Sequence, residues 1–272
     1  MKASIVSTVV GAVILFLFGL VPQAKSDCSS ILNTTYGWQG EAMYDANGNP
    51  GHPQIGAFVP LVQTGYLTFD GNGNFSGAHD SSLGGVLIPH LDSGTYSVNS
   101  DCTTGTIAFS TGVGDTMSFV ITSGGQEIKF VSTFSGGVDF GTLRPMAAPS
   151  CSASTLSGNT YGYSSHGLMG SGNGNGFPRV GGFIPFTDAG QITFAADGTV
   201  SGTDNQNFGG VVLPGQTIAG TYTVNSDCTG TTTMAIAGVD SSWHFVILQG
   251  ADQIIFIATP SGDVWAGALT KE

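Results

Sequence analysis

Histidines and carboxylates are the side chains in this sequence that could perform acid–base or metal chemistry, but few of them are suitably spaced. The chain has five histidines, at positions His52, His79, His90, His166 and His244. No two of them, and no pair of His and Glu, have the spacing of a metal-binding motif. Nucleophile motifs such as Gly-x-Ser-x-Gly and phosphate-binding loops are absent as well. We therefore predict no metal ion, no cofactor and no catalytic set.

Glu41 is the residue to consider as a functional acid. A carboxylate inside a β-barrel can have a raised pKa and then act as an acid or a base. In the internal repeat described below, His166 occupies the equivalent position. Strand alternation leaves two arrangements open, because Tyr36 and Trp38 lie on the face opposite Glu41. If these aromatic side chains point inward, Glu41 is on the outside and solvated.

An internal repeat reveals the elements that must position these residues. With a shift of 123 to 126 residues, GYLTFDGNGNFSG from Gly65 aligns with GQITFAADGTVSG from Gly190. In the same way, GTYSVNSDCT from Gly94 aligns with GTYTVNSDCT from Gly220. Each copy is large enough to form its own core. We predict one domain over residues 27–144, a short proline-containing linker over 145–150 and a second domain over 151–272.

The repeat also assigns the four cysteines to pairs. Each copy has one Cys at its start and one in its VNSDC segment. An even number of cysteines in an exported protein indicates disulfides, and pairing within a copy lets each domain close independently. We predict the disulfides Cys28–Cys102 and Cys151–Cys228. We interpret the Asn-Ser-Asp before the second Cys of each copy as a turn rather than as a metal or sugar site.

Each copy reads as a series of β-strands. Short runs of alternating apolar and polar residues are separated by Gly, Asn and Asp, and no segment after residue 26 has a helical period. Each copy contains eight or nine such runs, and closing the sheet removes its exposed edges. The sequence therefore predicts an all-β protein with two tandem antiparallel up-and-down β-barrels of about eight strands each. A β-sandwich is the alternative.

One set of apolar and aromatic side chains is expected on the inner face of each barrel, where we predict the ligand site. These residues are Tyr36, Trp38, Leu67, Phe69 and Phe119 in the first copy, and Tyr161, Tyr163, Ile192, Phe194 and Phe245 in the second.

The repeated motifs resemble an uncharacterised family of secreted bacterial domains. The resemblance rests on an opening Tyr-Gly, GYLTFDGNGNFSG, a Gly-Gly-Val segment, GTYSVNSDCT and a closing I-x-F strand, and it spans each copy. That family is itself similar to calycin barrels and to the allene oxide cyclase-like barrel. The resemblance implies a small calycin-like barrel with a central cavity. It implies no catalytic set. A plant-type cyclase would need a positioned carboxylate and an amide in the cavity, and we match neither to a residue of this sequence.

The first 26 residues have the pattern of a secretory signal peptide. Lys2 precedes an apolar stretch from Ile5 to Val21, and Ala24 and Ser26 are small residues at the −3 and −1 positions of a cleavage site. We expect cleavage before Asp27, no membrane association afterwards, and a secreted, extracellular or periplasmic location. In the remaining chain the 18 acidic residues outnumber the four basic ones by 14, which disfavours nucleic acid as a partner.

One strand differs between the copies in a way that indicates a partner surface. The first copy reads Glu-Ile-Lys-Phe-Val over residues 127–131, and the second reads Gln-Ile-Ile-Phe-Ile over 253–257. Ile255 and Ile257 would point outward, so that strand is apolar on both faces. We predict that these residues contact the other domain or a second protomer.

These observations favour a non-catalytic protein that binds a small apolar or aromatic ligand in each barrel. One alternative is a structural or surface-interaction protein whose barrels are filled with side chains. The other is an isomerase or cyclase of the allene oxide cyclase-like kind.

Overall fold

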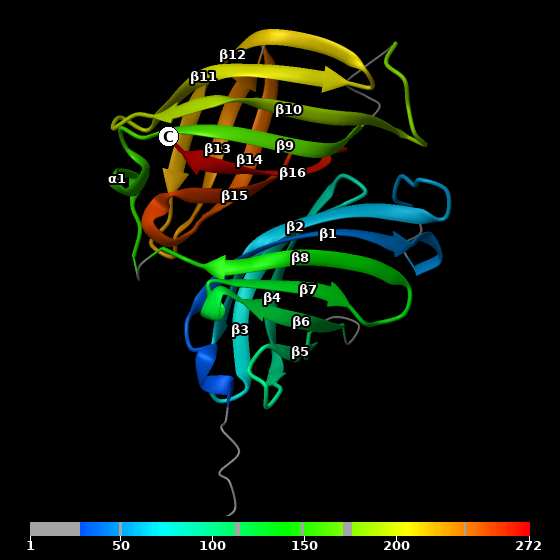
Figure 1. The fold of residues 1–272 in the computed structure, drawn as a ribbon. Coiled ribbons are helices and arrows are strands. Elements are labelled where there is room, and N and C mark those ends of the chain that lie inside the picture. Colours follow the sequence, from blue (N-terminus) through cyan, green and yellow to red (C-terminus); the bar gives the residue numbers. More distant parts are fainter. Residues whose placement is uncertain (1–27, 49–50, 112–114, 148–149, 171–175, 237) are drawn as a thin grey trace, which may run out of the picture.

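The chain folds into two closed antiparallel β-barrels of eight strands each, β1–β8 and β9–β16 (Figure 1). The structure is a computed structural model and describes residues 28–48, 51–111, 115–147, 150–170, 176–236 and 238–272. The prediction of two all-β barrels is confirmed, and the β-sandwich alternative is wrong. The predicted signal peptide over 1–26 lies outside the described residues. No helix in the described part of the chain is long and apolar enough to cross a membrane.

The strands are long and the connections between them are short. The first barrel comprises β1 (Thr35–Asp45), β2 (Phe58–Phe69), β3 (Asn74–Leu83), β4 (Val86–Val98), β5 (Thr104–Phe109), β6 (Thr116–Thr122), β7 (Glu127–Ser132) and β8 (Gly137–Pro145). The second comprises β9 (Thr160–Gly170), β10 (Phe183–Phe194), β11 (Thr199–Phe208), β12 (Val211–Val224), β13 (Thr229–Ile236), β14 (Val239–Ile247), β15 (Gln253–Ala258) and β16 (Val264–Lys271). The helical elements are η1 (Cys28–Ile31), η2 (Ala46–Gly48), η3 (Ser123–Gly125), α1 (Ala153–Leu156) and η5 (Gln249–Ala251).

Each barrel is an up-and-down meander that closes on itself. Consecutive strands pair in chain order, and β8 returns to pair with β1 as β16 does with β9. Successive side chains alternate between the two faces of a strand, so one face of each strand lines the core. Tyr36 and Trp38 are buried inside the first barrel, and Tyr161 and Tyr163 are buried at the matching positions of the second. This alternation places Glu41 on the outer surface of β1.

The two predicted disulfides are present. Cys28 is bonded to Cys102 and Cys151 to Cys228, so each bridge lies within one repeat. The Asn-Ser-Asp segments form turns, as interpreted from the sequence. The amide of Thr103 donates to Asp101 Oδ1 at 3.0 Å. In the second copy the amide of Thr229 donates to Asp227 Oδ1 at 3.1 Å.

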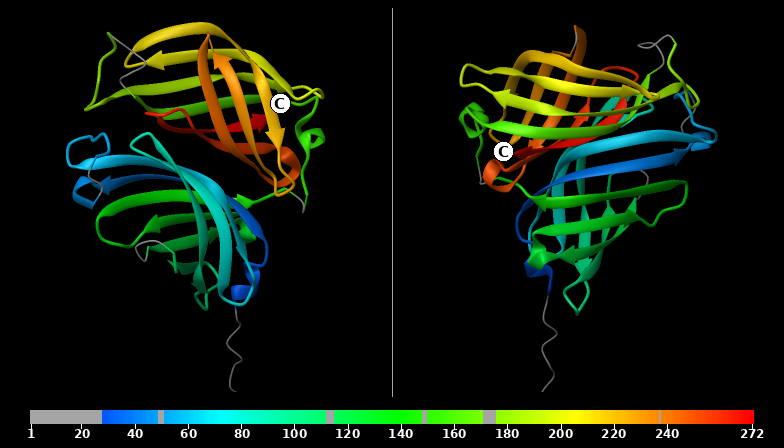
Figure 2. Two further views of the ribbon diagram at one scale, coloured as in Figure 1. Left: turned by 180° about the vertical axis from the view of Figure 1, so that it is seen from behind. Right: turned by 45° about the horizontal axis from the view of Figure 1, so that its top comes forward.

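The two barrels pack side against side, with β2 of the first against β14, β15 and β16 of the second (Figures 1 and 2). Val62 on β2 shares a buried apolar cluster with Ile257 on β15. The Gln39 side-chain amide donates to the backbone oxygens of Phe256 and Gly267, each at 2.9 Å. The contact therefore combines apolar burial with hydrogen bonds to the strands of the partner barrel.

Ile255 and Ile257 both lie on the outer face of β15 and are both buried. Ile257 shares a buried apolar cluster with Val62 of the first barrel, and Ile255 lies in a buried cluster that also contains Met146, just after β8. We propose that these two isoleucines stabilise the contact between the barrels.

A glycine pair joins the barrels at the tips of two hairpins. The amide of Gly262 donates to the oxygen of Gly85 at 2.8 Å. A Cβ atom at Gly85 would lie only 2.3 Å from the Cα of Gly262. Gly210, the repeat equivalent of Gly85, has a similar φ (+97° against +85°) but nothing within 4 Å of its Cβ position. The close approach is therefore specific to Gly85.

Gly85→Ala should therefore destabilise the protein more than Gly210→Ala. Both substitutions place an L side chain at positive φ, which costs about 1 kcal/mol, and only Gly85→Ala also pushes the hairpin tips apart. Chemical denaturation of both variants should show an extra loss of about 1 kcal/mol for Gly85→Ala. Equal losses would show that the glycine contact contributes nothing to stability.

Candidate functional site

The ten residues predicted to line the barrel interiors are all buried in the two cores. Rings fill the space beside the glycines of neighbouring strands. Phe119 lies over Gly105 and Phe245 over Gly230, where added Cβ atoms would be 2.3 and 2.2 Å from the rings. Of the ten, Trp38 also lines a cavity of about 260 Å³ at the mouth of the first barrel. The assignment of these residues to a ligand site stays a prediction.

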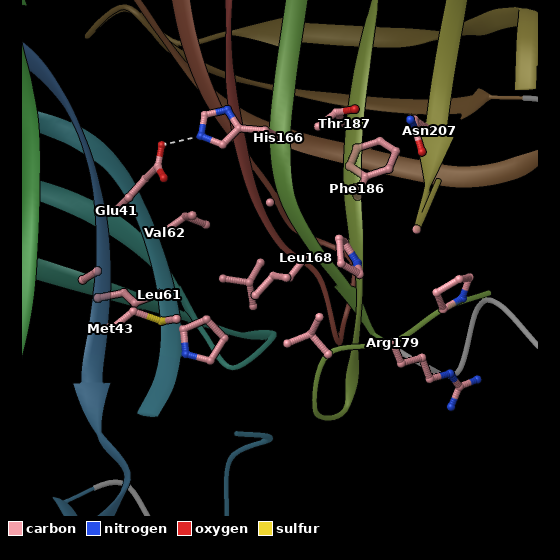
Figure 3. Close-up of a pocket in the computed structure, with 18 of the residues that line it drawn as sticks. Glu41, Met43, Leu61, Val62, His166, Leu168, Arg179, Phe186, Thr187 and Asn207 are labelled. Carbon is pink, nitrogen blue, oxygen red and sulfur yellow. Dashed lines mark ion pairs between the residues drawn. The ribbon is translucent and has the colours of Figure 1, made fainter. Parts of the chain in front are cut away.

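A groove between the two barrels has a volume of about 670 Å³ (Figure 3). Strands β1, β2 and β8 form one wall, and β9, β10, β11 and β16 form the other together with the segments 178–180 and 209–210. We refer to it as the inter-barrel groove.

Strand register sets the walls of this groove. In the first barrel Glu41 is paired with Val62 on β2 and with Phe140 on β8. In the second barrel His166 is paired with Thr187 on β10, in the equivalent register. Since side chains of paired residues project from the same face of a sheet, Glu41, Val62 and Phe140 line the groove together from one side, and His166 and Thr187 line it from the other.

Glu41 and His166 meet across the groove. Glu41 Oε1 is 2.8 Å from His166 Nε2, and Figure 3 shows the two side chains pointing toward one another from different barrels. The hydrogen bond and the negative charge of Glu41 raise the pKa of His166. The two positions that the repeat aligns with each other thus form an ion pair when His166 is protonated.

The rest of the groove is mostly hydrocarbon. Val138 and Phe140 on β8 are 64% and 53% exposed, and Val180 on the opposite side is 46% exposed. Exposed apolar side chains gathered in a concave site are typical of ligand or partner binding. Arg179 lies at the end of the groove away from the ion pair (Figure 3).

Few of the described residues that line the groove are ionisable, namely Glu41, His166 and Arg179. The groove's described lining residues include no Ser, Cys, Asp or Lys. Among the residues that the structure describes, no cluster of three or more His, Cys, Asp or Glu could hold a metal ion. The arrangement is therefore suited to binding an apolar molecule with a polar end.

A second polar cluster, which the histidine spacing did not predict, lies at the mouth of the first barrel. His79 and His90 stack with their ring centroids 4.4 Å apart. His79 Nδ1 is 2.6 Å from Asp92 Oδ2, and His90 Nε2 is 3.0 Å from Ser81 Oγ. Burial lowers the pKa of His90. The carboxylate contacts the histidine that does not contact Ser81, so no Ser–His–Asp relay is formed.

Sequence reasoning also missed Val138, Phe140 and Val180. Val138 and Phe140 alternate with inward residues on β8, so apolar residues at outward positions were a visible signal in the sequence. This signal was ambiguous, because apolar residues at outward positions can be covered by the other barrel or left exposed in a groove, and the sequence does not distinguish the two.

No protein-family model and no curated protein matches this sequence. Among solved structures, the chain is similar to that of CghA, with 9% identity and a TM-score of 0.28 over 88% of each chain. It is also similar to isotype 1 transferrin binding protein B from serogroup B Neisseria meningitidis. That match has 8% identity and a TM-score of 0.31, and it covers 87% of this chain and 74% of the other. A protein of unknown function from Nostoc punctiforme matches with 10% identity and a TM-score of 0.22, over 90% of this chain and 97% of that chain. TM-scores this low support no conclusion about function, and the resemblance to calycin-related domains stays a prediction.

Proposed function

We propose that this chain is an exported, non-catalytic binding protein whose small apolar ligand occupies the inter-barrel groove. The observation that supports this most strongly is a groove of about 670 Å³ whose wall exposes Val138 and Phe140. Sites for small molecules are typically concave, mostly apolar, and supplied with a few polar groups that orient the ligand. The pair formed by Glu41 and His166 would orient the polar end of such a ligand.

The groove is favoured over the barrel centres because aromatic and aliphatic side chains already fill the centres. It is favoured over a cyclase site because Glu41 lies outside the first barrel and is paired with a histidine. A cyclase would instead need this carboxylate inside the barrel cavity.

Export is supported by the two disulfides. Disulfides persist in oxidising compartments such as the extracellular space and the bacterial periplasm. The predicted signal peptide and the acidic composition agree with this location.

Phe140→Ser should weaken the binding of a neutral apolar probe such as N-phenyl-1-naphthylamine. The ring is half-exposed in the free protein, so its removal leaves the core intact but takes away apolar contact with the ligand. A loss of about 1.4 kcal/mol would raise the dissociation constant about tenfold. Fluorescence titration of the purified protein measures this constant.

The matched control is Val120→Ser. Val120 is exposed to a similar degree on β6 of the same barrel but does not line the groove. Its substitution should leave the dissociation constant unchanged. Absence of probe binding to the unmodified protein, or equal weakening by both substitutions, would contradict the proposal.

A further inference from the structure

The mouth of the second barrel contains a separate cavity of about 190 Å³, which we call the acidic cup. Its wall includes Phe186, Phe208 and Trp265, whose rings are in contact. The ring centroids of Phe186 and Phe208 are 5.1 Å apart, and those of Phe186 and Trp265 are 5.3 Å apart. Asp188 and Asp263 contribute carboxyl groups to the same cavity. Phe186 is the one described residue that lines both the cup and the inter-barrel groove.

Asp188 is only 5% exposed and one of its oxygens is unpaired. Ser165 Oγ donates to Oδ1, whereas Oδ2 has no hydrogen-bond partner among the described residues. Asp263 has weaker contacts, since its two oxygens accept from the amide of Gly170 and from Trp265 Nε1, each at 3.3 Å. A buried carboxylate without a partner is costly unless a cation or further donors satisfy it.

The first barrel carries different side chains at the positions equivalent to Asp188 and Asp204. Gln63, the repeat equivalent of Asp188, donates to Asp139 Oδ2 at 2.9 Å. His79, the equivalent of Asp204, lies 2.6 Å from Asp92. In the second barrel both positions are acidic.

The acidic cup also contains no base. Among the described residues that line it there is no Lys, Arg or His. None of the ion pairs formed by the described residues involves Asp188 or Asp263. When these carboxyls are ionised, no described residue that lines the cup balances their charge.

We propose that the acidic cup binds a small organic cation, with a primary ammonium group on Asp188 and an aromatic or aliphatic body against Phe186, Phe208 and Trp265. An ammonium group would supply the donor that Oδ2 lacks, and aromatic faces attract cations through their quadrupole. A cavity of about 190 Å³ has the volume of about six water molecules at ~30 Å³ each, which limits the ligand to a single ring with a short chain. A metal ion is a poorer fit, because no group of three ligands is assembled among the described residues.

Binding should depend on pH, because the ammonium group requires an ionised Asp188. Burial raises the pKa of this carboxyl to about 7. The titratable groups that interact with Asp188 or line the cup beside it are Tyr163 on β9, Asp204 on β11, Asp240 on β14 and Asp263 before β16, and none of them is basic. Affinity should thus rise as the pH increases from 5 to 8, falling about tenfold for each pH unit below 7.

The test is isothermal titration calorimetry of the full chain with 2-phenylethylamine at pH 8, with 2-phenylethanol as the neutral analogue. We expect saturable binding of the amine and at least tenfold weaker binding of the alcohol. Asp188→Asn preserves the shape of the side chain and should weaken amine binding at least tenfold. Asp197→Asn removes one charge from an exposed turn of the same barrel and should have no effect.

Several results would overturn the proposal. They are absence of amine binding to the unmodified protein, equal binding of amine and alcohol, and full binding by an Asp188→Asn variant whose melting curve shows that it is folded. These results would not contradict the proposed function of the inter-barrel groove, because that site is tested separately with a neutral probe and with Phe140→Ser.

Discussion

Ile257→Lys should lower the free energy of unfolding by about 3–5 kcal/mol. Ile257 is fully buried between the barrels, next to Val62 of the first barrel and Val264 of the second. A lysine there would either bury an unpaired charge or force the barrels apart, and both outcomes are strongly destabilising. Chemical denaturation measures the loss, and small-angle X-ray scattering detects any separation of the barrels.

The repeat provides a matched control for this substitution. Val131 occupies the equivalent position on β7 of the first barrel and is 53% exposed. Val131→Lys should therefore change the free energy of unfolding by no more than about 0.5 kcal/mol. Ile255→Lys should lower the free energy of unfolding about as much as Ile257→Lys. The first barrel tolerates Lys129 at the equivalent position because that residue is exposed, whereas Ile255 is buried. If the two isoleucine variants kept their stability and shape, the proposed role of this strand in holding the barrels together would have to be abandoned.

The stability of the ligand-free protein should fall as the pH rises from 4 to 7. Burial raises the pKa of Asp139 and of Asp188 to about 7, and that of Asp263 to about 6. A carboxyl with a raised folded-state pKa contributes stability that is fully present below its unfolded pKa and is lost as the pH rises through the folded one. For Asp188 the interval from 3.8 to about 7 corresponds to about 4 kcal/mol.

Asp188→Asn isolates the contribution of one carboxyl. The amide does not titrate, so the decline between pH 4 and 8 should be smaller by about 4 kcal/mol in this variant. Urea denaturation followed by tryptophan fluorescence is a suitable measurement, because Trp243 and Trp265 both lie in the second barrel. Asp197→Asn should keep the full decline, since that carboxyl is exposed and its pKa is lowered by bonds to Thr199. An unmodified protein that became more stable over this range would show that the buried acids are ionised at little cost.

Much of the fold could be predicted from the sequence because the patterns that indicate it are local and occur in both copies. Alternating residues identify strands, Gly, Asn and Asp identify turns, and a second copy repeats both. The disulfides followed because each copy has one Cys at its start and one in the VNSDC segment.

The candidate site was harder to predict because it depends on contacts between the copies. Alternation defines two faces of β1 but does not determine which one is inside, so the position of Glu41 stayed open. Its contact with His166 arises only when two barrels meet, and no local pattern encodes that. Asp188 did leave a signal, because it interrupts an inward-facing series that includes Phe186 and Ile192 on β10.

Strand β2 of the first barrel packs against β14, β15 and β16, which are not its repeat equivalents, and this matters for assembly. Such a contact could in principle be repeated by every added unit and grow into a fibre. The two copies differ at residues that a repeated contact would use. The outer face of β7 carries Lys129 where its counterpart carries Ile255, and the outer face of β10 carries Thr187 where β2 presents Val62. A further copy added through this contact would therefore meet a charged or polar side chain in place of an apolar one.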